Sequence, residues 1–199
     1  MADQTVTGLF DTPDQAHRAV TELEAAGIPH SQISIMSNNA DESWSNVSPA
    51  EEGRTSAAGA VGSIGALAGG GAGLLAGLGL LAIPGLGPVV AAGWLAAAAV
   101  GALAGGIAGG LIGALVDAGV SPEHAHVYAE GVRRGGSLVA ARVDDALASK
   151  ARSIMATNGA VDPETRRTVY EAGGWKGFDD AAPTYTQEEI EAERNRHNL

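Results

Sequence analysis

The longest uncharged stretch of the chain constrains its fold most. Between Arg54 and Asp117 no residue carries a charge, and glycine, alanine and leucine dominate the composition. At the middle of the stretch lies the segment 83–88, Ile-Pro-Gly-Leu-Gly-Pro. Its two prolines and two glycines interrupt a helix and are typical of a tight turn. The sequence therefore predicts a helical hairpin with the arms Ser56–Ile83 and Val89–Val116.

Small residues recur at every fourth position in both arms. Residues four apart lie on one face of a helix, so each arm would carry a nearly bare stripe backed by leucine. Each such glycine destabilises an isolated helix by about 1 kcal/mol relative to alanine, and close packing of two helix backbones offsets this loss. We interpret residues 55–116 as a glycine-zipper hairpin that packs on itself and on copies of itself. The predicted self-association positions are Gly65, Gly69, Gly73, Gly77, Gly93, Ala97, Gly101, Gly105, Gly109 and Gly113.

The environment of the hairpin is open at this point. Each arm is long enough to cross a hydrocarbon core of roughly 30 Å, which takes about 20 apolar residues. Glycine and alanine make the arms only marginally hydrophobic, so a water-soluble assembly that buries them is one alternative, and a hairpin buried in a soluble core is another. A flexible linker is a third interpretation, although a linker has no need of a four-residue repeat or of so many leucines.

Charge and composition exclude several classes of partner and site. The formal net charge is −11 and the pI is about 4.7, whereas nucleic-acid binding requires clustered lysine and arginine. The chain has no cysteine, which excludes disulfides and thiolate metal ligands. The first residues lack the basic and apolar regions of a cleavable signal, so we expect the N-terminus in the cytoplasm.

The residues before the hairpin predict a strand, a helix and a second strand. Alternating apolar residues indicate a strand over 5–10, and Thr12, Pro13 and Gln15 form a capping-box signature for a following helix. Gly27 would end that helix, and a strand over 32–36 follows.

The residues after the hairpin repeat this order. Ser121-Pro122 begins a helix, 137–143 is a strand, Asp144 caps another helix, and 160–162 is a last short strand. Two βαβ halves in one sheet, with helices on one face, form the ferredoxin-like α+β plan, here interrupted by the hairpin. The predicted boundaries are a first βαβ half at 1–37, a polar loop at 38–54, the hairpin at 55–116, a second half at 117–170 and an acidic tail at 171–199.

Three segments resemble a known family. Residues 6–36, the Gly-Val-Arg-Arg-Gly-Gly-Ser-Leu-Val sequence at 131–139 and Asn-Gly-Ala-Val-Asp at 158–162 are similar to the bacterial general stress proteins, also described as heat-induced stress proteins. In that family a βαβ half is often followed by a glycine-zipper segment. The resemblance implies a stress-linked bacterial protein that is membrane-associated and not catalytic, and it supplies no active-site residue.

The search for chemistry yields no catalytic, cofactor-binding or metal-binding candidate. His124 and His126 are two residues apart, which points them to different sides of a helix and does not suit a shared metal. The glycine run 69–73 lacks the Lys-Ser/Thr pair of a phosphate-binding loop. The pair Arg133 and Arg134 complements a helix C-terminus or, alternatively, binds an anionic headgroup. We predict that the protein is not an enzyme.

The tail and the hairpin together suggest three hypotheses. The tail contains the aromatic residues Trp175, Phe178 and Tyr185, and a short charged helix is predicted over 187–194. The tail either docks on the domain or a neighbouring subunit through these aromatic residues, or is an unstructured end. The first hypothesis is a homo-oligomer inserted in or bound to the inner membrane, with its soluble domain in the cytoplasm. The second is a lipid-free cytoplasmic particle, and the third is a sensor of an unknown small-molecule ligand.

Overall fold

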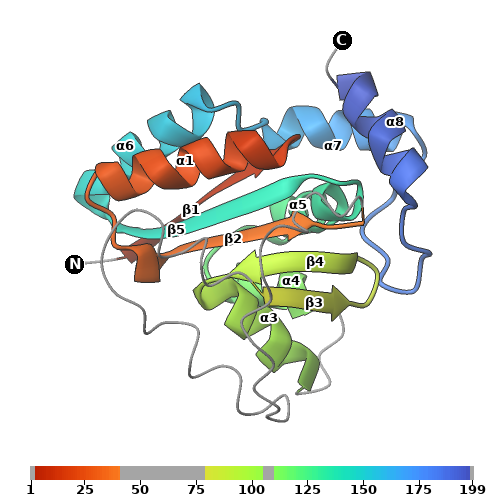
Figure 1. Ribbon diagram of the computed structural model, residues 1–199, viewed down its shortest axis with the longest axis horizontal. Coiled ribbons are helices and arrows are strands. Elements are labelled where there is room, and N and C mark those ends of the chain that lie inside the picture. The colour runs from red at the N-terminus through yellow and green to blue at the C-terminus, as the bar shows by residue number, and fades with distance from the viewer. Residues whose placement is uncertain (1–2, 41–78, 105–109, 198–199) are drawn as a thin grey trace.

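The computed structural model describes residues 3–40, 79–104 and 110–197. Within these ranges a five-stranded antiparallel sheet lies between two layers of helices (Figure 1), so the predicted α+β class is confirmed. The strand order is β1-β5-β2-β4-β3. The strands are β1 (Asp3–Phe10), β2 (Ile33–Asn38), β3 (Gly79–Ile83), β4 (Gly87–Ala92) and β5 (Ser137–Asp144).

Strand β5 joins the two halves of the chain. It pairs with β1 from Asp3↔Asp144 to Phe10↔Ser137 and pairs with β2 on its other side. The sequence-based expectation that both halves meet in one sheet is therefore confirmed. The predicted last strand at 160–162 is reduced to a single antiparallel bridge between Val161 and Leu9.

One face of the sheet is covered by two helices, α1 (Pro13–Ala25) and α6 (Asp145–Thr157). The predicted capping box at the start of α1 is present, with Thr12 and Gln15 bonding reciprocally, and Gly27 follows the helix with φ +93°. A short 3-10 turn, η1 (His30–Gln32), leads into β2. The apolar core under these helices includes Phe10, Val20, Leu23, Ile33, Ile35, Val139, Ala151 and Met155.

The opposite face is covered as well, which corrects the expectation of helices on one face only. Helices α3 (Trp94–Ala104), α4 (Gly110–Asp117) and α5 (Pro122–Arg133) lie on this side (Figure 1). Their core includes Leu9, Met36, Val89, Leu95, Leu111, Leu115, Tyr128, Val132 and Leu138. Two further helices, α7 (Pro163–Ala172) and α8 (Gln187–His197), complete the described chain. Helix α8 matches the predicted charged helix, whereas α7 was not predicted.

The segment 79–92 is a β-hairpin, so the predicted helical arms are wrong next to the turn, at 79–83 and 89–92. Farther along the second arm the predicted helical structure is present in α3 and α4. The turn itself is where the sequence predicts it: the Leu86 N–H donates to the Ile83 carbonyl at 3.0 Å, and Gly85 has φ +75°. Proline followed by a glycine with positive φ is typical of a type II turn. A short apolar run bounded by glycine and proline is compatible with a buried strand or a helix. Here the free edge of β2 selects the strand conformation, because β4 pairs with this edge and residues 89–92 become buried.

The predicted self-association positions fall in three places. Gly65, Gly69, Gly73, Gly77, Gly105 and Gly109 lie outside the described residues. Gly93 is not a helical position, since it has φ +88° at the junction between β4 and α3. Ala97 and Gly101 lie in α3, and Gly113 lies in α4. Within the described ranges, no helix is long and apolar enough to cross a membrane.

The glycines at 93 and 101 should respond oppositely to alanine. A Cβ at Gly93 would overlap the Ile33 carbonyl oxygen, and its φ is unfavourable for any other residue. Gly101 is exposed in a helix, and a Cβ there would meet nothing within 4 Å. We expect Gly93→Ala to lower the free energy of unfolding by about 3 kcal/mol, and Gly101→Ala to raise it by about 0.5–1 kcal/mol.

Urea unfolding of the two variants beside the wild type measures both effects. Equal effects of the two substitutions would contradict the different backbone conformations assigned to these glycines.

Candidate functional site

The apolar end of the sheet is the most unusual surface of the described chain. Side chains alternate along β3, so Leu81 and Ile83 pack into the core under α3 while Leu80 and Ala82 point to the other face. Leu80 is 67% exposed, and Ala82 and its cross-strand neighbour Pro88 are exposed beside it. We call Leu80, Ala82 and Pro88 the hairpin edge.

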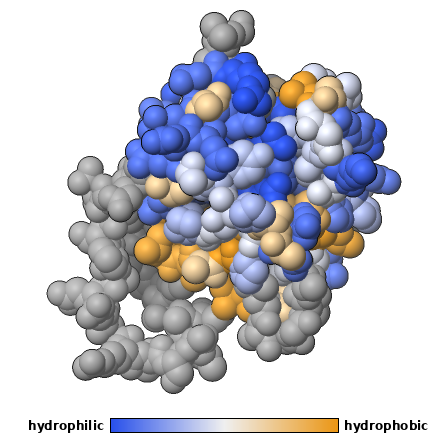
Figure 2. Space-filling model, turned by 90° about the vertical axis from the view of Figure 1, so that its right-hand side faces the viewer, coloured by the Kyte–Doolittle hydropathy of each residue, from blue (hydrophilic) through white to orange (hydrophobic). Residues whose placement is uncertain are grey.

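Hydrophobic and hydrophilic residues separate on the surface. In Figure 2 the upper part of the visible face is mostly hydrophilic, with a small hydrophobic group at the upper right, and more hydrophobic residues gather in the lower part. Figure 1 places β3, β4, α3 and α4 at this lower end and α7 and α8 at the upper end. The described part of the apolar segment, 79–104 and 110–116, therefore forms one end of the domain.

Helix α3 is apolar around its whole circumference. Its sequence, Trp-Leu-Ala-Ala-Ala-Ala-Val-Gly-Ala-Leu-Ala, contains no charged residue, and the side facing away from the core carries the exposed Ala98 and Gly101. Helices of this kind are typical of buried positions. The start of α3 is held to β2 and to η1, because the Leu95 N–H donates to the Ser34 hydroxyl at 2.9 Å and the Trp94 Nε1–H donates to the Gln32 carbonyl at 3.2 Å.

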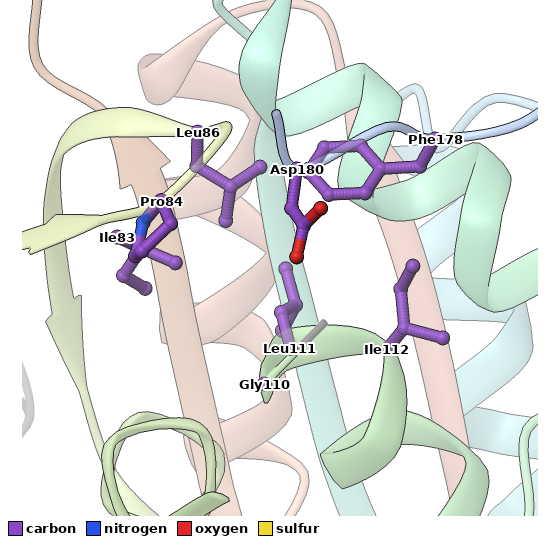
Figure 3. A pocket seen from close by; sticks show the side chains of 8 residues that line it. All are labelled: Ile83, Pro84, Leu86, Gly110, Leu111, Ile112, Phe178 and Asp180. Atoms are coloured by element: carbon purple, nitrogen blue, oxygen red, sulfur yellow. The ribbon is translucent and has the colours of Figure 1, made fainter. Parts of the chain in front are cut away.

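The C-terminal tail crosses the tip of the β-hairpin. Phe178 packs against the core that includes Leu86 and Leu111, and Asp180 lies directly over the turn (Figure 3). A Cβ added to Gly85 would lie 2.6 Å from the Cα of Asp180. The pocket between these residues has a volume of about 10 Å³, room for about one water molecule and far too small for a metabolite. The glycine in the turn thus permits close approach of the tail.

A buried ionic cluster anchors the same tail to the end of α5. Glu130 is 0% exposed and accepts from Arg134 Nε at 2.6 Å and from Arg133 at 2.9 Å. Arg134 also pairs with Glu193 of α8 at 3.0 Å. Burial raises the cost of leaving any of these charges without a partner. The cluster therefore fixes α8 against α5.

Aromatic and apolar contacts surround the cluster. The Arg134 guanidinium lies 4.3 Å from the centre of the Tyr170 ring and 5.5 Å from that of Tyr185. Ile190 is fully buried against Gly135, whose carbonyl accepts from Arg194 at 2.9 Å. The prediction that the tail docks through aromatic residues is confirmed for Phe178 and Tyr185.

The structure places the remaining candidates apart from one another. His124 pairs with Glu164 at 2.8 Å, whereas the Nδ1 of His126 accepts from the Phe178 N–H at 3.2 Å. In the part of the chain that the structure describes, no group of three or more His, Asp or Glu side chains is arranged to hold a metal. Asp144 occupies the N-cap position of α6 but makes no side-chain cap bond.

Sequence reasoning missed the role of Glu130. It assigned Arg133 and Arg134 to a helix C-terminus or a headgroup, and the structure shows them paired with a carboxylate one turn earlier. The signal was available, because a glutamate three and four residues before two arginines lies on their helix face.

Comparisons of the chain with protein-family models, curated proteins and solved structures find no match. The resemblance to bacterial general stress proteins therefore stays a prediction from the quoted motifs.

Loss of the buried Glu130 carboxylate should weaken the packing of the tail on α5. We expect Glu130→Gln to lower the free energy of unfolding by about 3 kcal/mol, because Arg133 and Arg134 would keep their buried charges without the shared partner. The matched control is Glu164→Gln, an exposed carboxylate that pairs with His124 and Arg167, for which we expect a change below about 1 kcal/mol. Denaturant unfolding of both variants checks this, and similar losses in the two would contradict the role of the cluster.

The buried Tyr170 should make the fold sensitive to alkali. Burial raises its pKa from 10.0 to about 12, against the opposing effect of Arg166. Below pH 10 both folded and unfolded states hold the proton, and between pH 10 and 12 only the unfolded state loses it. Stability is therefore expected to fall across this window by roughly 1.4 kcal/mol per pH unit from this group.

Denaturant unfolding of wild type and Tyr170→Phe at a series of alkaline pH values measures this contribution. The free energy of unfolding of Tyr170→Phe should fall less steeply with pH than that of the wild type. Equal slopes for the two proteins would contradict the raised pKa of Tyr170.

Proposed function

We propose that this protein is a non-enzymatic, self-assembling protein that associates through its uncharged segment, residues 55–116. We further propose that the rest of the chain is a ferredoxin-like domain carrying this segment as an insertion. The strand order β1-β5-β2, the bridge of Val161 to β1, and α1 and α6 on one face support that assignment. The β3–β4 hairpin would then extend the sheet beyond β2.

The observation that carries the proposal is the exposure of apolar groups at one end of a chain whose formal net charge is −11. Leu80 is largely exposed in a strand without charges, and α3 adds the exposed Ala98 and Gly101. Covering one leucine side chain contributes roughly 1.5–3 kcal/mol. Association of copies would remove this surface from water.

The length of α3 bears on the environment of the assembly. Its 11 residues extend for roughly 16 Å, about half of a hydrocarbon core. This favours an assembly bound to the membrane surface, or a lipid-free cytoplasmic particle, over one in which α3 alone spans the bilayer. The cytoplasmic side of the inner membrane, a link to stress and a bacterial origin remain part of the proposal because of the family resemblance.

Light scattering after size-exclusion chromatography, with a lipid assay of the same fractions, tests this function. We expect an oligomer, and lipid in its fractions separates a membrane-bound assembly from a particle. Replacing Gly101 and Gly105 by leucine should reduce the mass by widening helix contacts, whereas the control Ala172→Leu adds leucine to an exposed site on α7 and should leave it unchanged. A monomeric wild type would contradict the proposal.

A further inference from the structure

Strand β3 is the last strand of the sheet. Among the described strands it pairs with β4 alone, so no described strand forms hydrogen bonds with the N–H and carbonyl groups on its other side. Natural proteins commonly protect such an edge with lysine, proline or a bulge. The sequence of β3, Gly-Leu-Leu-Ala-Ile, contains no lysine and no proline.

The side chains of β3 leave the same edge apolar on its outer face. Helices α1 and α6 pack on β1, β2 and β5, and Figure 1 shows them above that part of the sheet. The hairpin edge of Leu80, Ala82 and Pro88 lies beyond them and is exposed. Among the described residues, β3 therefore combines a side without a paired strand and an apolar strip at one place.

The opposite end of the sheet is different. There β1 is bridged by Val161, whose N–H donates to the Leu9 carbonyl at 2.8 Å, and α6 packs against β1. Its outer positions also include the polar Gln4, which accepts from Arg152 and donates to Asp145. Polar contacts and a bridge thus occupy the β1 end, and the β3 end has neither among the described residues.

We propose that two copies of this chain pair their β3 strands antiparallel, edge to edge, so that the two sheets become continuous. The inference rests on the proposed self-association and specifies its partner and geometry. A strand paired antiparallel with its own copy across a two-fold axis is its own complement. With the axis at Leu81, Leu80 of one copy faces Ala82 of the other.

Charge favours pairing of two copies through β3 over pairing through surfaces that carry carboxylates. The formal net charge of −11 makes two copies repel, and acidic residues brought together across a seam would add to this. No charged residue lies between Arg54 and Asp117. Pairing through β3 therefore joins the copies where the seam itself contains no carboxylate.

A charge at the edge tests the proposal on the full chain. Leu80→Lys places an ammonium on the exposed face, and the matched control Val169→Lys changes another exposed large apolar residue, on α7. Sedimentation velocity should show the mass of Leu80→Lys assemblies falling about two-fold, because the paired unit is lost. Val169→Lys should match the wild type, and circular dichroism checks that both variants are folded.

Spin labels measure the pairing directly, and the absence of native cysteine makes each introduced cysteine unique. In the variant Leu80→Cys, the two Cα atoms of residue 80 in the paired copies should lie within roughly 10 Å of each other. The same distance is expected between the two Cα atoms of residue 82 in the variant Ala82→Cys. A label at Val169→Cys should give a much longer separation or none.

The outcomes separate this inference from the proposed function. A monomeric wild type refutes self-association and the pairing together. An assembled wild type, with Leu80→Lys of unchanged mass and labels at 80 and 82 far apart, refutes the β3 pairing and leaves self-association standing. Loss of vesicle binding by Leu80→Lys without loss of mass identifies a lipid surface as the occupant, which also overturns the pairing.

Discussion

The pairing of β5 with both β1 and β2 is the interaction on which the rest of the structure depends. These strands come from opposite ends of the chain, with the uncharged segment between them. Residues 137–141 are buried on both faces of the sheet, and their side chains alternate between two apolar cores. Because each core also needs its own helices, placing β5 determines where α1 and α6 pack on one side and α5 on the other.

The uncharged segment belongs to this architecture. Strand β4 pairs with β2, α3 and α4 share a core with α5, and the tail crosses the β3–β4 turn. The position of Gly85 lets the tail backbone approach, and the cluster around Glu130 holds α8 at the end of α5. The tail, the apolar end and the sheet are thus linked through contacts.

Much of this fold could be predicted from local signals. The capping box at Thr12, the Ser-Pro start at Ser121 and the glycine stop at Gly27 are short-range devices that act through the residues next to them. The start of α7 at Asp162-Pro163 has the same form as that at Ser121-Pro122, so a local signal for the unpredicted helix α7 is present. The turn at 83–88 was predicted because proline and glycine act locally as well.

The wrong predictions of secondary structure arose where a residue's conformation depends on a partner far away in the sequence. Apolar residues at 79–92 suit a helix or a buried strand, and the edge of β2, some fifty residues away, selects the strand. A four-residue repeat likewise gives no information about φ, so Gly93 was counted in a helix although it forms the junction before α3. The ionic cluster of Glu130 needs α8 to complete it, which no local pattern reveals.

Native-state hydrogen exchange of β4 tests most directly whether the uncharged segment is part of the sheet. The account predicts that amides within 89–92 are protected by pairing with β2 to nearly the same free energy as those of β5. Exchange of the β4 amides at the rates of an unstructured peptide, while β1 and β5 stay protected, would contradict it.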